Sequence, residues 1–388
     1  MSESEMPLEI LLDYLNKLAY SSLNLWDIPD DCIVKLINVS ENATYLVSNS
    51  SGFKAILRVH RENYHTERAI ECELEWIANL SNKKSVKVPG HFIGKNNKPI
   101  QEAQIEGLKN KRYLVLFEFV EGIQPDENSE LEKSFEELGE IAALTHVNSI
   151  NWIKPKNFER LIWDANAVFG NNATWGDWRD GPNVTNKDKQ ILENAEDVVC
   201  RRLNNFGKSE ERYGLIHADM RLANLLIDDN GTRLIDFDDC GFGWFLYDFA
   251  AAISFMEDDP RIPNLKSNWL KGYRKIRAIS ENDENEIETF IMLRRMALLA
   301  WVGSHIETPE ASSLAPDFSK ITVQIAENYL KKFLILIKLM KPEKLLINLQ
   351  IIKIKKNHIL IQRLKLLVKF IYSKESGIYL AKVKYSVT

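Results

Sequence analysis

Four polar residues, His217, Asp219, Asn224 and Asp236, have the types and the spacing for one chemical step. The first three share a polar segment, and the residues between Asn224 and Asp236 predict two short strands joined by a turn. The antiparallel pairing of such a hairpin places Asp236 next to Asn224. Phosphoryl transfer from ATP requires a carboxylate that orients a hydroxyl, together with two oxygen ligands for magnesium.

The same residues resemble the motifs of a known enzyme family. His217-Ala-Asp219, with Asn224 five residues after Asp219 and Ile235-Asp236-Phe237 beyond it, is similar to the aminoglycoside phosphotransferase and choline kinase superfamily. The acidic segment 236–239 also resembles hydroxylysine kinase-like members and stress response kinase A. The resemblance covers roughly residues 30–330. It implies an α+β, two-lobed protein-kinase-like fold with a β-rich N-lobe and a mainly helical C-lobe.

By this resemblance Asp219 is the catalytic base, Asn224 and Asp236 hold Mg2+, and His217 is a buried support for the loop. Arg221 lies where many protein kinases have a lysine that touches the transferring phosphate. We therefore expect Arg221 to contact the γ-phosphate of ATP.

Further acidic and aromatic residues follow the motif. Asp248 is expected to hydrogen-bond the backbone of the catalytic loop. Asp238 and Asp239 are candidates for a second magnesium or a substrate ammonium group, although solvated turn acids have the same appearance. Trp244, with Trp175 and Trp178, lines an acceptor pocket or belongs to the core.

The N-terminal half supplies candidates for ATP binding. Arg58, in Ala55-Ile-Leu-Arg58, takes the place of the kinase lysine and is expected to contact the α- and β-phosphates, because a guanidinium clamps phosphate well. Its helix partner is expected to be Glu73, with Glu71 and Glu75 as competitors.

Two more segments are expected to meet the nucleotide. Segment 40–44 occupies the position of the kinase glycine loop, so Ser40 and Thr44 would offer hydroxyls to phosphate. Segment 117–122 resembles the hinge between lobes, where backbone groups of Glu118 and Val120 would pair with adenine.

The spacing of hydrophobic residues predicts the helices and strands that must position these residues. Residues 7–19 predict a helix, a meander of three strands follows, and Thr66 caps a second helix. Helical patterns dominate beyond residue 129. The predicted strands are 32–39, 43–47, 53–59, 112–120, 213–216, 225–227 and 232–235, and the later helices are 187–206, 246–257, 264–279, 283–304 and 317–340. We expect an N-terminal segment 1–29, an N-lobe 30–122, a C-lobe 123–330 and an extension 331–388.

Composition limits the class of protein. The 388 residues contain 45% hydrophobic and 27% charged side chains, which is typical of a globular chain with two or three domains. A net charge of −5 gives no general reason to bind nucleic acid. Four scattered cysteines indicate a reducing cytoplasm, and we expect neither export nor a transmembrane span.

The extension differs from the rest of the chain. It holds fourteen Lys or Arg and two Glu, a net of +12, so residues 1–330 carry −17. Three interpretations are open: an amphipathic surface for anionic lipid or nucleic acid, a solvated helical extension, or an end translated out of frame. We favour one of the last two, without a role in chemistry.

The predicted reaction is transfer of the γ-phosphoryl group of MgATP to a hydroxyl of a small, amine-bearing acceptor, since the acidic folded part suits a cation. One alternative is a protein Ser/Thr kinase resembling stress response kinase A, with a protein substrate. Another is a pseudokinase-like nucleotide-binding module.

Overall fold

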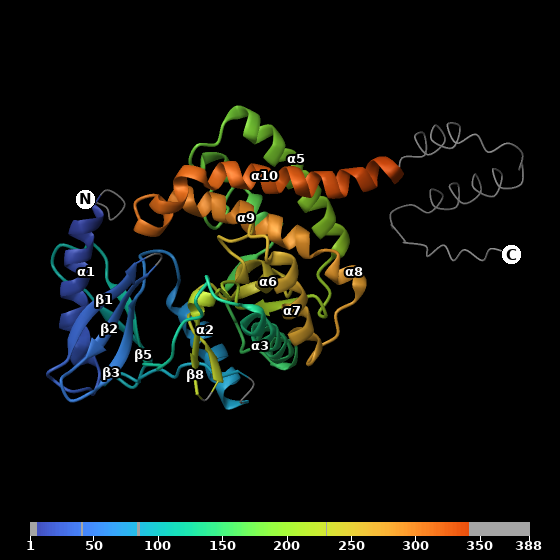
Figure 1. Cartoon of the computed structure of the whole chain (residues 1–388). Coiled ribbons are helices and arrows are strands. Elements are labelled where there is room, and N and C mark those ends of the chain that lie inside the picture. The colour runs from blue at the N-terminus through green and yellow to red at the C-terminus, as the bar shows by residue number, and fades with distance from the viewer. Residues whose placement is uncertain (1–5, 40–41, 84–85, 230, 341–388) are drawn as a thin grey trace, which may run out of the picture. The chain divides into compact units, whose positions relative to one another are not determined.

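The structure is a computed structural model that describes residues 6–39, 42–83, 86–229 and 231–340. Met1–Tyr329 forms one compact unit and Leu330–Thr388 a second. The described residues of the second unit, 330–340, are helical. Most of the basic extension, from residue 341 onward, lies outside the described residues. Figure 1 shows the chain from the N-terminal sheet to the helical part.

The N-lobe is built on one antiparallel sheet, which confirms the predicted meander of three strands. The strand order is β1-β2-β3-β5-β4, and the fourth strand in sequence was not predicted. The strands are β1 (Ile33–Val39), β2 (Ala43–Ser48), β3 (Lys54–Val59), β4 (Ile100–Ala103) and β5 (Arg112–Glu118).

Alternation along the strands separates core from cleft. Tyr45 and Leu57 pair across β2 and β3 and are buried in a core that includes residues of helix α1 (Leu8–Ser22). Their neighbours Thr44 and Arg58 also pair, so both side chains leave the opposite face of the sheet. The strand period therefore places the predicted phosphate contacts together, away from α1.

Helix α2 (Glu67–Asn82) joins the two lobes. Thr66 caps it, as predicted, because its side chain accepts a hydrogen bond from the N–H of Ala69 at 3.0 Å. The Trp76 indole donates to Asn148 Oδ1 at 3.2 Å in the C-lobe. The cap fixes where the helix that carries Glu73 begins, and the Trp76 contact holds this helix against the C-lobe.

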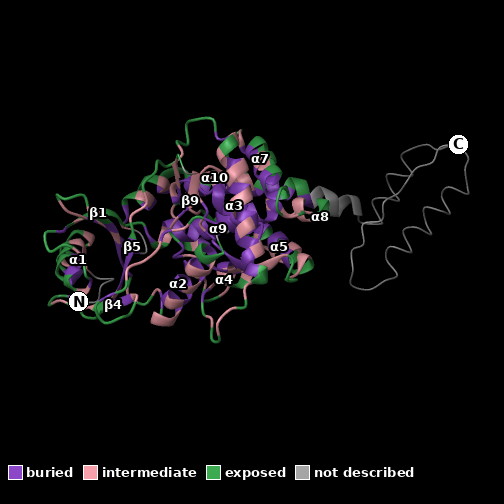
Figure 2. Ribbon diagram, turned by 90° about the horizontal axis from the view of Figure 1, so that it is seen from below, coloured by how far each residue is buried: buried purple, intermediate pink, exposed green. Residues whose placement is uncertain are grey.

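The C-lobe is mainly helical, which confirms the predicted α+β class. Its helices are α3 (Glu132–Asn151), α4 (Ala165–Phe169), α5 (Asn186–Phe206), α6 (Tyr247–Ala252), α7 (Ile262–Arg274), α8 (Glu281–Glu284), α9 (Ile287–Ser304) and α10 (Pro309–Met340). Helix α9 is buried on nearly every side, as expected for a helix that is apolar all round. Figure 2 shows buried residues gathered along α3 and α9.

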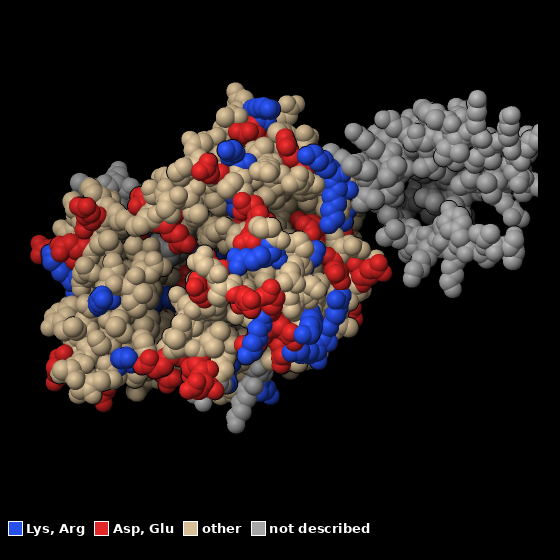
Figure 3. Space-filling view, viewed as in Figure 1, with Lys and Arg blue, Asp and Glu red and all other residues tan. Residues whose placement is uncertain are grey.

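Helices α3 and α7 pack closely because each has a glycine at the crossing. A Cβ atom at Gly139 would meet the carbonyl oxygen of Trp269, and one at Gly272 would meet that of Glu136. Surface charges on these helices pair, with Lys275 Nζ 3.2 Å from Glu140 Oε2. Figure 3 shows Lys and Arg mixed with Asp and Glu on this face. Among the described residues, no helix is long and apolar enough to cross a membrane.

Five short strands frame the predicted motif. The hairpin of β8 (Leu225–Asp228) and β9 (Gly231–Leu234) is confirmed. A second sheet, of order β6-β10-β7, contains β6 (Leu161–Trp163), β7 (Tyr213–Ile216) and β10 (Gly241–Trp244). Strands β6 and β10 were not predicted. Gly241 and Gly243 give β10 no strand signal, yet a Cβ atom at Gly241 would collide with the Leu161 carbonyl of the neighbouring strand.

Candidate active site

The loop between β7 and β8 carries Asp219 and is held by buried groups. Ala218 has a left-handed backbone with φ +66°, a strained conformation for a residue with a side chain. Asp248 Oδ1 accepts the Ala218 N–H at 2.7 Å, and Asp248 Oδ2 accepts the His217 N–H at 3.2 Å. The buried His217 ring lies 3.1 Å from the Ile235 carbonyl through Nε2. His217 and Asp248 thus brace the loop from inside.

Asp219 is surrounded by donors. Asn224 Nδ2 donates to Oδ2 at 2.8 Å, and Arg294 Nη2 donates to Oδ1 at 2.8 Å. Arg221 Nε lies 3.2 Å from Oδ1. Burial acts to raise the pKa of Asp219, but the charges of Arg221 and Arg294 outweigh it and hold that pKa below its ordinary value. Asp219 is therefore an ionised carboxylate that is fixed in orientation.

The hairpin brings Asp236 to the same place. The Ile235 N–H donates to the Asn224 carbonyl at 3.0 Å, directly beyond the β8–β9 ladder. Asp236 has a left-handed φ of +59°, and its side chain is 51% exposed. The turn thus presents the Asp236 carboxylate beside the loop of Asp219.

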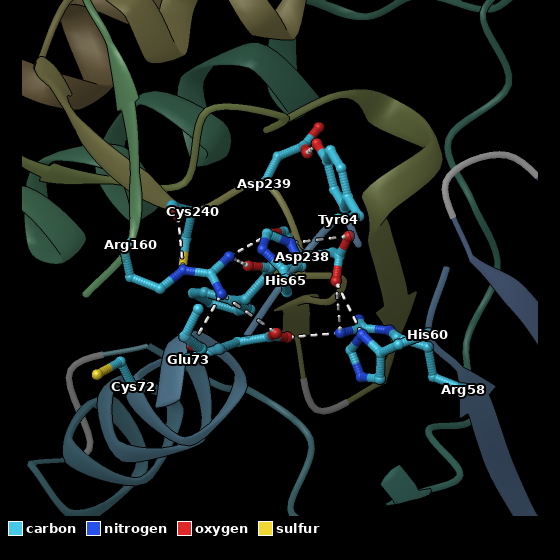
Figure 4. Close-up of polar contacts among 12 residues, drawn as sticks. Arg58, His60, Tyr64, His65, Cys72, Glu73, Arg160, Asp238, Asp239 and Cys240 are labelled. Carbon is cyan, nitrogen blue, oxygen red and sulfur yellow. Dashed lines mark hydrogen bonds and ion pairs between the residues drawn. The ribbon is translucent and has the colours of Figure 1, made fainter. Parts of the chain in front are cut away.

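Arg58 links the N-lobe to this cluster. Its Nη1 lies 2.6 Å from Glu73 Oε1, and its Nη2 lies 2.8 Å from Asp236 Oδ1. The competitors Glu71 and Glu75 instead pair with Arg68 on the outside of α2. Figure 4 shows Glu73 and Asp238 both turned toward Arg58.

The Asp238 carboxylate is buried between the two lobes. Its side chain is only 9% exposed, and Oδ1 lies 3.4 Å from Arg58 Nη1. His65 Nε2 lies 3.4 Å from Oδ2, and His60 Nδ1 lies 3.7 Å from Oδ1 (Figure 4). This enclosure favours a structural role for Asp238 over the expected contact with substrate or a second magnesium.

Arg160 was missed by the sequence analysis and holds the same network together. Its side chain is fully buried, and it donates to the carbonyls of Ala69 in α2 at 2.9 Å and of Cys240 at 2.8 Å. It also donates to the Asp238 carbonyl (Figure 4). Nothing near Arg160 in sequence signals this role, because all its partners are distant along the chain.

Asp239 points elsewhere and is half-buried. Its Oδ1 accepts a hydrogen bond from the Tyr64 hydroxyl at 2.8 Å, and its carbonyl accepts one from the Trp163 indole at 2.7 Å. Burial lowers the pKa of Arg294, but Tyr247, Asp219 and Asp239 together raise it above the ordinary value. The negative charges of Asp239 and Asp219 therefore both stabilise the charged guanidinium of Arg294.

Arg294 was also missed, although the sequence contains a signal for it. Arg294 and Arg295 interrupt a long apolar run in α9, where a charge is expensive to bury without a partner. The second arginine of this pair contacts Glu257 instead, with Arg295 Nη1 2.6 Å from Glu257 Oε2.

Arg221 lies between Asp219 and helix α10. Its Nη1 donates to Glu310 Oε1 at 3.1 Å in the first turn of α10, and its guanidinium lies 5.2 Å from the Phe255 ring centroid. About a quarter of its side chain is exposed. It is thus placed beside Asp219 and tethered to α10.

The structure does not bring Trp244 to these residues. Its indole donates to the Gly207 carbonyl at 2.7 Å, and its ring packs on Tyr213 and Phe290 in the C-lobe core. Trp178 is likewise buried and donates to Glu196. Trp175, by contrast, lies 5.1 Å from the Arg294 guanidinium and so belongs to the site.

The nucleotide segments are only partly described. Ser40 lies outside the described residues, whereas Thr44 pairs with Arg58 and lies on the same face of the sheet. The Glu118 N–H donates to the Gly90 carbonyl at 2.9 Å, so it is already occupied. Val120, which is half-buried, remains the candidate hinge donor for adenine.

Asn224 and Asp236 fit a divalent cation. Because Asn224 Nδ2 faces Asp219, its amide oxygen points away from that carboxylate. Although Asp236 is half-exposed, desolvation and the charges of Asp238 and Asp219 raise its pKa in spite of Arg58. A bound cation would relieve this repulsion. Mg2+ in kinases takes one or two such side chains together with phosphate oxygens.

Comparison with known sequences gives the family. The profile of the phosphotransferase enzyme family matches residues 34–279, more than half of the chain. The amicoumacin kinase of Bacillus subtilis (strain 168) is 24% identical over 236 residues, which are 58% of this chain and 67% of that protein.

Solved structures agree. A microcompartment-associated aminopropanol kinase is 40% identical, with a TM-score of 0.75 over 81% of this chain and 97% of that one. An amicoumacin kinase in complex with AMP-PNP and Ca2+ shares the fold at 19% identity, with a TM-score of 0.64 over 83% of this chain and 95% of that one. These relatives are small-molecule kinases and do not favour the protein-kinase or pseudokinase alternatives. The chain therefore belongs to the phosphotransferase enzyme family, within the aminoglycoside phosphotransferase and choline kinase superfamily, and is an ATP-dependent kinase for a hydroxyl group of a small molecule.

Proposed function

We propose that the chain transfers the γ-phosphoryl group of MgATP to the hydroxyl of a small amino alcohol. The observation that carries the proposal is the convergence of Asp219, Asn224, Asp236 and Arg58 between the lobes. The 40% identical aminopropanol kinase supports an acceptor that bears both a hydroxyl and an amine.

In the proposed reaction Asp219 accepts a hydrogen bond from the hydroxyl group of the acceptor. This bond orients the hydroxyl oxygen toward the γ-phosphorus. The new bond joins that oxygen to phosphorus, the bond to the β,γ-bridging oxygen breaks, and the hydroxyl proton passes to Asp219. Because the pKa of Asp219 is held low, it is a weak base, so proton transfer comes late and orientation is its main contribution.

The remaining roles concern charge. Asn224 and Asp236 would hold Mg2+, which neutralises phosphate charge when bound. Arg58 would contact the α- and β-phosphates, Thr44 would offer its hydroxyl, and Val120 would meet adenine. Arg221 would meet the γ-phosphate; unchanged turnover in R221A would exclude this contact.

Asp239 is the proposed partner of the acceptor ammonium group. Its half-buried carboxylate acts on the same guanidinium as Asp219, and its charge suits a cation.

We further propose the lobe boundary at residue 122, flanking segments 1–29 and 331–388, and a reducing cytoplasmic setting. The four free cysteines suit such a compartment.

The test measures ATP consumption with Mg2+ for three acceptor pools: amino alcohols, aminoglycosides, and proteins with Ser or Thr. D219N is the control. Turnover on an amino alcohol that D219N abolishes supports the proposal, whereas label on protein alone contradicts it. An aminopropanol should outperform the matching propanediol in the wild type, and D239N should remove that preference while leaving KM for ATP unchanged.

A further inference from the structure

Arg294 contacts the carboxylate that the proposed reaction uses. It comes from the middle of α9, its side chain is 2% exposed, and its Nη2 donates to Asp219 Oδ1 at 2.8 Å. Its Nε donates to Ser254 Oγ at 3.1 Å. Two bonds from one planar guanidinium therefore fix its orientation relative to Asp219.

Aromatic rings restrict Arg294 further. Its Cζ lies 5.1 Å from the ring centroid of Trp175 and 5.8 Å from that of Tyr247. Trp163 lies against both rings, with centroid separations of 4.8 Å to Trp175 and 6.1 Å to Tyr247. The guanidinium is thus held in a cation–π environment, with little freedom to swing away from Asp219.

Stability alone does not explain this arrangement. Burying a guanidinium removes it from water, and this desolvation cost must be offset by its ion pair with Asp219. An apolar side chain of similar volume would often be no worse for stability than a buried charge. A charge kept at this position is better explained by its contact with Asp219.

The next residue on α9 provides the contrast. Arg295 is also 2% exposed and also pairs with a carboxylate, since its Nη1 lies 2.6 Å from Glu257 Oε2. It further donates to Thr322 Oγ1 at 2.8 Å and to the Phe318 carbonyl at 3.1 Å. Successive residues of a helix point about 100° apart. The two arginines therefore share one helix and one degree of burial but face different partners.

We propose that Arg294 is a positioning residue for phosphoryl transfer. It holds Oδ1 of Asp219 while Asn224 holds Oδ2, so the carboxylate cannot rotate away from the acceptor hydroxyl. The inference rests on the proposed role of Asp219. A catalytic group displaced by about 1 Å loses about 100-fold in rate, and this sets the size of the effect.

The experiment compares R294M, R294K, R295M and D219N with the wild type on the same acceptor. R294M should lower kcat about 100-fold. KM for ATP should stay unchanged, because the contacts of Arg294 lie within the C-lobe. R294K should recover part of the lost kcat. R295M should unfold at lower urea while keeping kcat near that of the wild type.

A second measurement covers the case in which R294M does not fold. R294A leaves a cavity of guanidinium size beside Asp219, so added methylguanidinium should raise its kcat but not that of R295A. Equal loss of kcat in R294M and R295M would overturn the proposal, as would a loss confined to KM for ATP or failure of this rescue. A wild type no more active than D219N would instead refute the proposed function itself.

Discussion

Asp248 holds Ala218 in a left-handed backbone conformation, through a 2.7 Å hydrogen bond from the Ala218 N–H to Asp248 Oδ1. His146 Nε2 lies 2.9 Å from the other oxygen of the same buried carboxylate. The backbone of the loop that carries Asp219 is thus fixed by a residue 30 positions away. Strain of this kind persists only where surrounding structure enforces it.

D248N should therefore lower both stability and turnover. The side-chain amide of Asn has one accepting oxygen where the carboxylate of Asp has two. One buried N–H donor therefore loses its partner, and the free energy of unfolding should fall by about 3 kcal/mol. Urea unfolding and kcat measure the two effects. D258N, at an exposed site nearby, is the matched control. Wild-type turnover in a folded D248N would show that the loop needs no such anchor.

Arg58 should matter for ATP affinity because it bridges Glu73 and Asp236 between the two lobes. R58M should raise KM for ATP about 10- to 100-fold, equivalent to about 1.4–2.7 kcal/mol. R68M is the control, since Arg68 also pairs with two glutamates but on the outside of α2. Initial rates against ATP concentration measure both. A similar KM in the two variants would remove Arg58 from phosphate binding.

Asp236 and Asp238 should separate metal binding from structure. D236N should raise the Mg2+ concentration needed for half-maximal activity, because the half-exposed carboxylate is a proposed ligand. D238N should instead destabilise the fold, because its carboxylate is buried among Arg58, His60 and His65. Rates across a Mg2+ titration, with urea unfolding, distinguish them. The metal assignment fails if D238N shifts the Mg2+ requirement and D236N does not.

Stability should fall on the acid side because of His60. It is buried, neither ring nitrogen has a hydrogen-bond partner among the residues that the structure describes, and burial lowers its pKa to about 3. In the unfolded state the pKa of His60 is about 6.5, so between about pH 6.5 and pH 3 the unfolded state binds a proton that the folded state does not. This contribution is complete above about pH 6.5 and falls by about 1.4 kcal/mol per pH unit as pH drops toward 3.

H60F should flatten this dependence, since the ring makes no hydrogen bond within the described ranges that Phe would lose. Urea unfolding at pH 7.5, 6.5 and 5.5 measures the slope for the wild type and H60F. Identical slopes for the two proteins would contradict the assignment of His60 as a neutral buried group.

Much of the site follows from the sequence because its geometry is local. The β8–β9 hairpin joins Asn224 to Asp236 through eleven intervening residues, so spacing and turn chemistry suffice to bring them together. Strand alternation likewise puts Arg58 on the cleft face, and a capped helix shortly afterwards carries Glu73 to it. Resemblance to a known family then supplied the roles.

The tertiary structure decided what depends on distant contacts. Asp238 and Asp239 are adjacent and chemically alike, yet one is enclosed by Arg58, His60 and His65 while the other turns to Tyr64. No period or spacing distinguishes them, because their surroundings come from another lobe. The unpredicted strand β10 arises in the same way, since a glycine-rich strand is defined by its neighbours β6 and β7.

The arginines show the same division. Composition marks Arg294 and Arg295 as charges inside an apolar helix, but not which of them meets Asp219, 75 residues earlier in the chain. That choice depends on how α9 is rotated against the catalytic loop, and packing of the whole C-lobe sets this rotation. Local spacing thus determined which polar groups come together at the proposed site, whereas only the packed fold decided which buried charges hold them in place.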